Sequence, residues 1–285
     1  MQLWGYQIWL EMWLGGMAGG AFLVAFLYEL FSGQKNKQLL RPATFIAIPL
    51  VVMALILSLL DLGMMDRFWH MMVVIMPLSP IWIGAILLAG FVGLCVIMAL
   101  LYIVAGRKGA ENSKGILSFI GLLSWINAII AAVLIAYSGV MLAASNVPLW
   151  ADTPLMPSLF VASAAATGVA ILIFSALIYR SAWQESGETL KKLSGALSIV
   201  VIIQVLLLAG LVVMAGDSAK VMVTGSLMIP FFADIALLVL GIVLIVAARA
   251  KIEKGGMRAV AILASLLVIV GGLLMRAVII IGGQS

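Results

Sequence analysis

The chain has 285 residues, of which 65% are hydrophobic and only 9% are charged, and its mean hydropathy is +1.29. A sequence of this composition lacks the polar surface of a water-soluble globule, which excludes a soluble protein and indicates one embedded in a membrane. The formal net charge of +5 raises the question of an acidic partner such as nucleic acid, and the placement of the basic residues answers it.

Eight apolar stretches are long enough to span a bilayer, which requires about 20 residues of helix. They cover residues 8–31, 42–62, 81–105, 116–143, 155–179, 194–215, 227–248 and 258–281. We predict helices, because backbone polar groups in lipid must be satisfied internally and the stretches lack the alternation of barrel strands. The first stretch has no basic region or cleavage site before it, so we interpret it as the first helix of the mature protein. The predicted fold class is an all-α integral membrane protein with eight transmembrane helices and no soluble domain.

Lys and Arg residues are divided unequally between the two sets of connections. Thirteen of the 16 lie in the first, third, fifth and seventh connections. These are Lys35, Lys37, Arg41, Arg107, Lys108, Lys114, Arg180, Lys191, Lys192, Arg249, Lys251, Lys254 and Arg258. Short cytoplasmic loops are enriched in Lys and Arg, so we predict that both termini lie on the outer, periplasmic side of the cytoplasmic (inner) membrane. The same asymmetry explains the positive charge without any nucleic acid.

Polar side chains gather near the outer ends of three of the first four predicted helices and in the connection of residues 61–80. They are Glu11, Asp61, Arg67, His70, Tyr137 and Asn146. At a rise of 1.5 Å per residue, Glu11 in the first helix and Tyr137 in the fourth fall at a similar depth. Ionisable groups within membrane spans are rare and are candidates for function. We therefore predict a functional site at this level.

Several of these residues have a structural alternative. Asp61 can cap its helix or pair with Arg67, His70 can be an ordinary loop residue, and Tyr137 can belong to the interfacial belt of aromatic residues. Glu11 is harder to explain in this way, because a carboxylate at its depth must neutralise itself or find a partner. The sequence leaves these alternatives open.

The second half of the chain has its own polar residues. Asp234 in the seventh helix and Arg276 in the eighth lie at a similar depth from the outer side. They predict either a buried ion pair that stabilises the fold or part of a proton path. Asn127 and Gln204, near the midplane, are either interhelical hydrogen-bonding residues or further steps of that path.

The inventory of ligands limits which cofactors this chain can hold. Cys95 is the only cysteine and His70 the only histidine. One cysteine cannot form a disulfide or hold an iron–sulfur cluster within the chain, and one histidine cannot supply both ligands of a bis-histidine haem. We therefore predict no haem, no iron–sulfur cluster and no metal site in this chain.

Four ordered motifs resemble those of one family. They are LGGMAGG (14–20), whose glycines four residues apart permit close helix packing, LDLGMMDRFWHM followed by PLSPIWIGA, AYSGVMLAASNVPLW followed by LFVASAAATG, and the terminal GGLLMRAVIIIGGQ. Together they are similar to the NrfD/PsrC-type membrane subunits of polysulphide-reductase-like complexes. The resemblance implies a single domain over residues 1–285. The helices of residues 8–143 would form a quinone-binding four-helix bundle and those of residues 155–281 a second bundle.

The resemblance also implies a quinone, menaquinone or ubiquinone, as cofactor. Tyr137 matches the tyrosine that the family places at the quinone. Glu11 stands where the family often has a polar ligand such as histidine, so the glutamate departs from the pattern. The remaining matches are Asp61, Arg67 and His70 in the outer-loop motif and Asn146 and Trp150 in an NxPLW-like segment.

The implied partners are a ferredoxin-like iron–sulfur subunit on the outer face and a molybdenum or tungsten catalytic subunit behind it. The connection of residues 61–80 would cover the quinone pocket and help to dock the iron–sulfur subunit. Two other classes fit eight apolar helices, namely a secondary transporter or ion channel and a passive anchor. The halves show no internal repeat of the kind that transporters often have. Glu11 and Tyr137 at one depth argue against a passive anchor.

Overall fold

The computed structural model describes residues 4–32, 39–61, 69–74, 76, 79–179, 187–252 and 257–284, and these contain helices and no strand. The long helices are α1 (Tyr6–Ser32), α2 (Leu40–Asp61), α4 (Pro80–Asn112), α5 (Lys114–Ala143), α7 (Met156–Ile178), α8 (Gly187–Ala215), α10 (Met228–Ile252) and α11 (Arg258–Gly282). The short ones are α3 (His70–Val73), α6 (Pro148–Ala151), the 3₁₀ helix η2 (Gly216–Ala219) and α9 (Lys220–Val223). Each long helix is long and apolar enough to cross a membrane, which confirms the predicted fold class.

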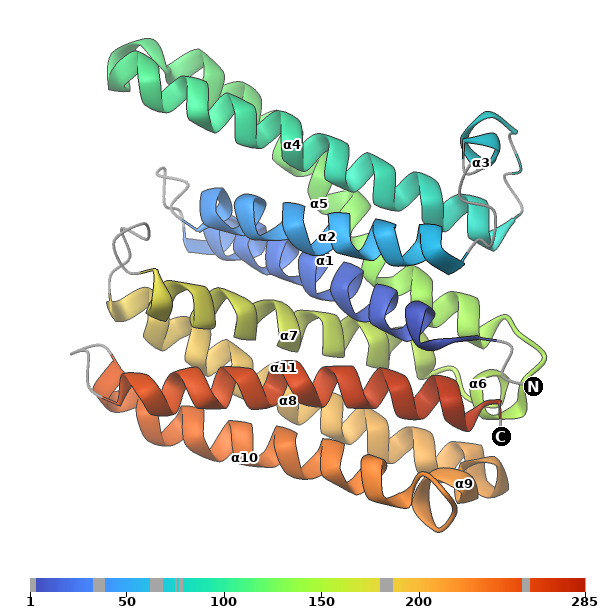
Figure 1. Ribbon diagram of the computed structural model, residues 1–285. Helices are drawn as coiled ribbons and strands as arrows, with labels where there is room; N and C mark the ends of the chain where they lie inside the picture. Colours follow the sequence, from blue (N-terminus) through green and yellow to red (C-terminus); the bar gives the residue numbers. More distant parts are fainter. Residues whose placement is uncertain are drawn as a thin grey trace.

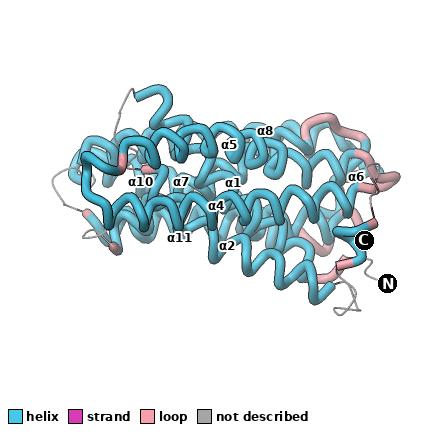
Figure 2. The backbone as a smooth tube through the Cα atoms, turned by 90° about the horizontal axis from the view of Figure 1, so that it is seen from above, coloured by secondary structure: helices cyan, strands magenta, loops and turns pink. Residues whose placement is uncertain are grey.

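The long helices run alternately in opposite directions along roughly one axis (Figures 1 and 2). Both termini and the short helices α3, α6 and α9 lie at one end of the molecule, which we name the terminal end (Figure 1). The last turns of α1, α4, α7 and α10 and the first turns of α2, α5, α8 and α11 lie at the other end, which we name the opposite end. This arrangement follows from an even number of spans joined by short connections.

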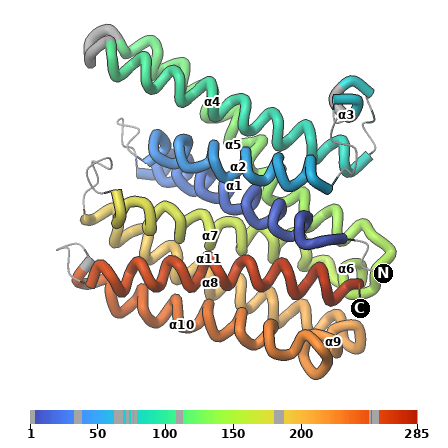
Figure 3. Tube along the Cα trace, in the orientation of Figure 1, coloured from blue at the N-terminus to red at the C-terminus, as the bar shows by residue number. Residues whose placement is uncertain are grey.

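The helices form two contacting groups. In the first, α1 packs against α2 and α5, and α4 packs against α2 and α5. In the second, α7 and α10 each pack against both α8 and α11. Contacts of α7 with α1 and α5, and of α11 with α1, join the groups, so α1 and α7 lie between α4 on one side and α10 on the other (Figure 3).

Glycines allow the central helices to come very close. A Cβ atom on Gly20 of α1 would collide with the Ala164 carbonyl of α7, and one on Gly168 would collide with the backbone nitrogen of Ala21. Gly19 faces α5 instead, where a Cβ atom would lie 2.8 Å from Ile135 Cγ2. Close packing through small residues is a common way for membrane helices to associate. The prediction for LGGMAGG is therefore confirmed, and it applies to both helix groups.

Two helices are longer than the apolar pattern predicted. Helix α4 continues to Asn112, beyond the predicted end at 105, and α8 begins at Gly187, before the predicted start at 194. The extra turn of α8 carries an exposed ion pair, with Lys192 Nζ 2.8 Å from Glu188 Oε1 four residues earlier. Such pairs stabilise exposed helix, whereas hydropathy marks only the part of a helix that is apolar.

The two chain ends meet at the terminal end. The Trp4 backbone N–H donates to Gln284 Oε1 at 2.8 Å, and Gln284 Nε2 donates to the Trp4 carbonyl at 3.3 Å. The Trp4 ring stacks on Trp150 of α6 with centroids 5.3 Å apart, and Trp150 Nε1 donates to the Ile279 carbonyl of α11 at 2.8 Å. We name Trp4, Trp150 and Gln284 the terminal clasp, because they join the start of α1, α6 and the end of α11.

Candidate functional site

Four helices of the first group bring polar groups together near the terminal end. Glu11 comes from α1, Ser58 and Asp61 from the last turns of α2, and Tyr137 from α5. The fourth helix, α4, contributes the backbone around Gly84. We name this set the polar site.

Tyr137 packs against the start of α4. Its hydroxyl donates to the Pro80 carbonyl and lies 3.5 Å from Met141 Sδ, one turn further along α5. A Cβ atom on Gly84 would lie 2.8 Å from Tyr137 Cε1 and 2.9 Å from its hydroxyl oxygen, so only glycine leaves room for the phenol at this position. Tyr137 as a whole is half-buried, and its hydrogen bond to Pro80 is exposed, so its role as a belt residue or as a ligand of the site stays a prediction.

Glu11 is the centre of the polar site. It is half-buried and lies within electrostatic range of Ser58 and of the exposed Asp61 carboxyl. The Tyr137 hydroxyl is within electrostatic range of Glu11 as well. Glu11 and Tyr137, for which the sequence predicted a similar depth, thus lie within electrostatic range of each other. Their role in binding stays a prediction.

The donors and surface of the polar site are compatible with a quinone. A quinone ring needs an apolar surface and hydrogen-bond donors for its two carbonyl oxygens. Tyr137 supplies one donor. A second N–H at this level, Trp82 Nε1 in the first turn of α4, is buried and has no hydrogen-bond partner. Orphaned buried donors are uncommon and call for an explanation, and a bound ligand is one. Across the described residues, no three His, Cys, Asp or Glu side chains are grouped to hold a metal ion.

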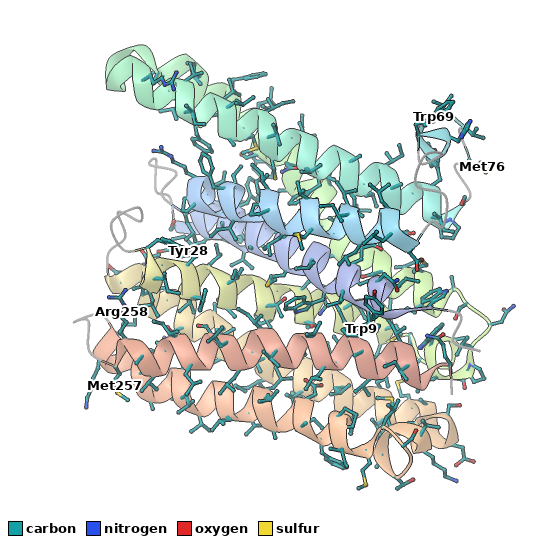
Figure 4. All side chains as sticks on the ribbon, in the orientation of Figure 1. Trp9, Tyr28, Trp69, Met76, Met257 and Arg258 are labelled. Atoms are coloured by element: carbon teal, nitrogen blue, oxygen red, sulfur yellow. The ribbon has the colours of Figure 1, made fainter. Side chains whose placement is uncertain are left out.

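Two further predicted residues of the outer loops, His70 and Asn146, make no described contact with Glu11. His70 is exposed and stacks on Trp69 with ring centroids 3.7 Å apart, and α3 packs against α4. Figure 4 shows Trp69 at the periphery of the molecule, away from Trp9 on α1. Asn146 is exposed between α5 and α6, and Arg67 lies outside the described residues. Among the described contacts, none joins His70 or Asn146 to Glu11 or Tyr137.

Asp234 and Arg276 are brought together in the second group. Both are buried and lie within electrostatic range of each other, and Asp234 Oδ1 has no hydrogen-bond partner. Arg276 Nη1 donates to Ser163 Oγ at 2.8 Å and to the Gly272 carbonyl at 3.1 Å. The Arg276 guanidinium therefore makes its direct hydrogen bonds to α7 and α11, with the Asp234 charge nearby.

Asn127 and Gln204 are both fully buried and do not meet the polar site through any described contact. Asn127 Nδ2 donates to Cys95 Sγ at 3.2 Å, which joins α5 to α4, and Asn127 Oδ1 has no partner. Neither Nε2 nor Oε1 of Gln204 has a hydrogen-bond partner. Asn127 therefore makes a hydrogen bond between helices, while its part in a polar path stays a prediction.

Sequence reasoning missed Ser58 and Gly84. Ser58 lies three residues before Asp61 in α2, so helical spacing places both on one face. That spacing, applied to the polar residues of a predicted span, was a usable signal. Gly84 was visible only as part of the PLSPIWIGA motif, because its contact with Tyr137 depends on how α4 packs against α5.

Comparison with known proteins gives the family. No curated protein matches the chain closely enough to be a relative. The family model described as polysulphide reductase, NrfD, matches residues 2–285, which is essentially the whole chain, and confirms the resemblance of the four motifs. The chain therefore belongs to the NrfD family of membrane subunits of quinone-linked oxidoreductase complexes.

Proposed function

We propose that this chain is the quinone-reactive membrane subunit of a multi-subunit respiratory oxidoreductase. The observation that carries the proposal is the proximity of Glu11 and Tyr137, which reach the polar site from α1 and α5 in a chain of the NrfD family. The site combines a phenol donor and a half-buried carboxyl group. Such a set suits a small ligand that has two carbonyl oxygens and exchanges protons.

The residues of the polar site have separate roles in this proposal. A bound quinone, menaquinone or ubiquinone, supplies two-electron chemistry coupled to two protons. Tyr137 would hold it by donating the hydroxyl hydrogen that the Pro80 carbonyl accepts in the structure described here. Glu11 would hold or release a proton at its carboxyl oxygen, close to the terminal end.

The arrangement of the complex follows from the same site. The terminal end would face the outer side of the cytoplasmic membrane, because the connections at the opposite end hold most of the Lys and Arg residues. A ferredoxin-like iron–sulfur subunit would dock on the terminal end, since electron transfer requires short distances to the quinone. A molybdenum or tungsten catalytic subunit would bind to that iron–sulfur subunit.

Two conservative substitutions test the proposal in the purified complex. Tyr137→Phe removes one neutral hydrogen bond and should weaken binding of a fluorescent quinone-site inhibitor, such as an alkyl hydroxyquinoline N-oxide, by about 0.5–1.5 kcal/mol. Glu11→Gln keeps the shape of the side chain but cannot carry a proton. It should retain most of the inhibitor binding and lower quinone-coupled turnover about a hundredfold.

The control is electron transfer from artificial dyes directly to the partner subunits, which bypasses this chain and should be unchanged in both variants. Ser265→Ala offers a matched change elsewhere, because the Ser265 hydroxyl is buried in α11 and donates only to the Ala261 carbonyl at 2.9 Å. If Tyr137→Phe and Glu11→Gln both bind inhibitor and turn over quinone at the wild-type level, the quinone does not bind at the polar site.

A further inference from the structure

We propose that an anionic phospholipid binds at the junction of α8 and α10 at the opposite end, with its phosphate held by Arg249 and Lys191. The acyl chains of the lipid lie along the outward surface of the two helices. This lipid site is independent of the quinone site, because both of its helices belong to the second group.

The Arg249 side chain is folded onto the neighbouring helix. Arg249 lies in the last turn of α10, and α10 packs against α8 at the edge of the molecule that lies opposite to α4 (Figure 1). A Cβ atom on Gly195 of α8 would lie 2.7 Å from Arg249 Nη2 and 3.0 Å from its Cζ. The guanidinium group therefore occupies the space that a side chain at residue 195 would fill, which fixes a positive charge between the two helices.

This charge forms no ion pair with any described residue. The acids within α8 and α10 are Glu188, which pairs with Lys192 at 2.8 Å, and Asp234, which lies near the other end of α10. Arg249 is exposed, so an anion from outside the chain can reach it. A guanidinium group presents several N–H donors in one plane and binds phosphate oxygens in pairs.

The residues around Arg249 add further positive charge. Residues 187–192 of α8 and residues 249–258, from the end of α10 to the start of α11, contain six basic residues and two acidic ones. Lys191 precedes Gly195 by one helical turn, so it lies on the same face of α8, and it is exposed. A phosphate group at this junction thus meets the planar donor of Arg249 and the flexible ammonium group of Lys191.

The depth of the junction is that of a lipid headgroup. The apolar span of α10, Met228–Arg249, ends at Arg249 itself. Exposed apolar side chains follow towards the membrane interior, with Ile199 four residues after Gly195 and Val246 three residues before Arg249. Acyl chains cover such side chains, whereas a soluble anion gains nothing from them. Basic sites between helices at this level bind the headgroups of anionic lipids.

Membrane topology alone does not require this arrangement. The preference for basic cytoplasmic loops depends on how many Lys and Arg residues a connection holds, and not on where each side chain lies. The helix dipole favours a cation in the last turn of α10, but it does not require a glycine on α8 opposite that cation. The placement of Arg249 over Gly195 is therefore the observation that carries the lipid site.

Native mass spectrometry of the purified, delipidated full-length chain tests the site by titration with phosphatidylglycerol and, separately, with phosphatidylcholine. The wild type should bind its first phosphatidylglycerol about tenfold more tightly than phosphatidylcholine. Arg249→Gln should abolish this preference by weakening phosphatidylglycerol binding about tenfold, because hydrogen bonds to charged groups contribute that much. Arg249→Lys keeps the charge without the paired donors and should give an intermediate affinity.

Three further variants separate a positioned site from general charge. Gly195→Ala changes no charge but displaces the guanidinium group from α8, so it should also weaken phosphatidylglycerol binding. Lys114→Gln is the matched control, because it removes an exposed basic residue of the same end from α5 in the first group, and it should bind like the wild type. Glu253→Gln removes the acid nearest to Arg249 in the sequence, one that lies outside the described residues, and should not weaken binding.

Two results would refute the site at Arg249. The first is wild-type affinity for phosphatidylglycerol in Arg249→Gln, and the second is an equal loss in Arg249→Gln and Lys114→Gln, which would mean that lipid responds only to the total charge of the opposite end. Inorganic phosphate should fail to displace the bound lipid at millimolar concentration. Displacement would identify a site for a soluble anion and would overturn the assignment to a lipid.

Discussion

Arg276 is the largest side chain that the fold buries completely within the described residues. Its guanidinium group lies 5.4 Å from the centre of the Phe160 ring and occupies the space over Gly16, where a Cβ atom would lie 2.7 Å from Nη2. The guanidinium therefore contacts α1, α7 and α11 at the junction of the two helix groups, near Asp234 of α10. A charge buried in this way is retained only when its surroundings satisfy it.

Removal of either partner should therefore destabilise the protein strongly. Asp234→Ala leaves the guanidinium without its neighbouring negative charge, and Arg276→Ala leaves the carboxylate unpaired and a cavity at the junction. We expect each to lower the free energy of unfolding by about 3–5 kcal/mol, as seen when one partner of a buried pair is lost. The measurement is thermal unfolding of the purified protein in detergent.

The double variant Asp234→Ala with Arg276→Ala distinguishes the interaction between the two residues from the contacts that each makes with other residues. If the two charges are coupled, the double variant should lose clearly less free energy of unfolding than the two single variants lose together. Strict additivity would show instead that Asp234 and Arg276 act independently, and the hydrogen bonds of Arg276 to Ser163 and Gly272 would then account for its burial.

Counting helix rise from the sequence placed Asp234 and Arg276 at the same depth, and the fold agrees. The same counting could not show that Arg276 bonds to Ser163, because that contact depends on how α11 is rotated against α7. Glu11 and Tyr137 are similar. Their depth was predictable, whereas the contact of Tyr137 with Gly84 required the packing of α4 against α5 to be known.

Helix α1 is packed more tightly than the other helices of the first group. Its glycines meet the backbone of α7, and Trp13 Nε1 donates to the Ile269 carbonyl of α11 at 3.1 Å. At the opposite end, Glu29 Oε1 accepts from the backbone N–H groups of Leu39 and Leu40 at 3.0 and 2.7 Å, which fixes the start of α2. Helix α1 is therefore the element that sets the position of Glu11 relative to both groups.

Substitution at the crossing of α1 and α7 should be costly. Gly20→Ala adds a methyl group where the Ala164 backbone lies, and backbone cannot move aside as a flexible side chain can. We expect a loss of about 3 kcal/mol in the free energy of unfolding, at the upper end of overpacking effects, and reduced assembly. Thermal unfolding and the yield of monodisperse protein measure it.

Gly93→Ala is the matched control for the helix crossing. Gly93 lies in α4, is exposed, and has no atom within 4 Å of the position that a Cβ atom would occupy. Alanine is the better helix former, so this change should leave stability unchanged or raise it by about 1 kcal/mol. Equal losses for Gly20→Ala and Gly93→Ala would contradict close packing as the cause.

The long helices of the molecule were predictable from the sequence, whereas the short helices and the contacts between the two chain ends were not. Apolar length identified all eight long helices, because the bilayer sets that length. The short helices α3, α6, η2 and α9 escaped prediction, since each is too brief to carry a periodic pattern. The terminal clasp was also beyond the sequence, because Trp4 and Gln284 are 280 residues apart and meet only when both groups have packed.

The sidedness of the molecule decides which face a redox partner can reach, and labelling of single cysteines tests it. The wild-type chain is a nearly silent background, because its one cysteine, Cys95, is fully buried. Ser226 is exposed at the terminal end and Lys114 is exposed at the opposite end, where basic residues gather, so each can be replaced by a cysteine that a reagent reaches. In cells with an intact cytoplasmic membrane, an impermeant maleimide should label Ser226→Cys, whereas Lys114→Cys should react only after that membrane is opened. Moving so many Lys and Arg side chains outwards is unfavourable, so the reverse pattern would overturn both the assigned orientation and the docking of an iron–sulfur partner beside the polar site.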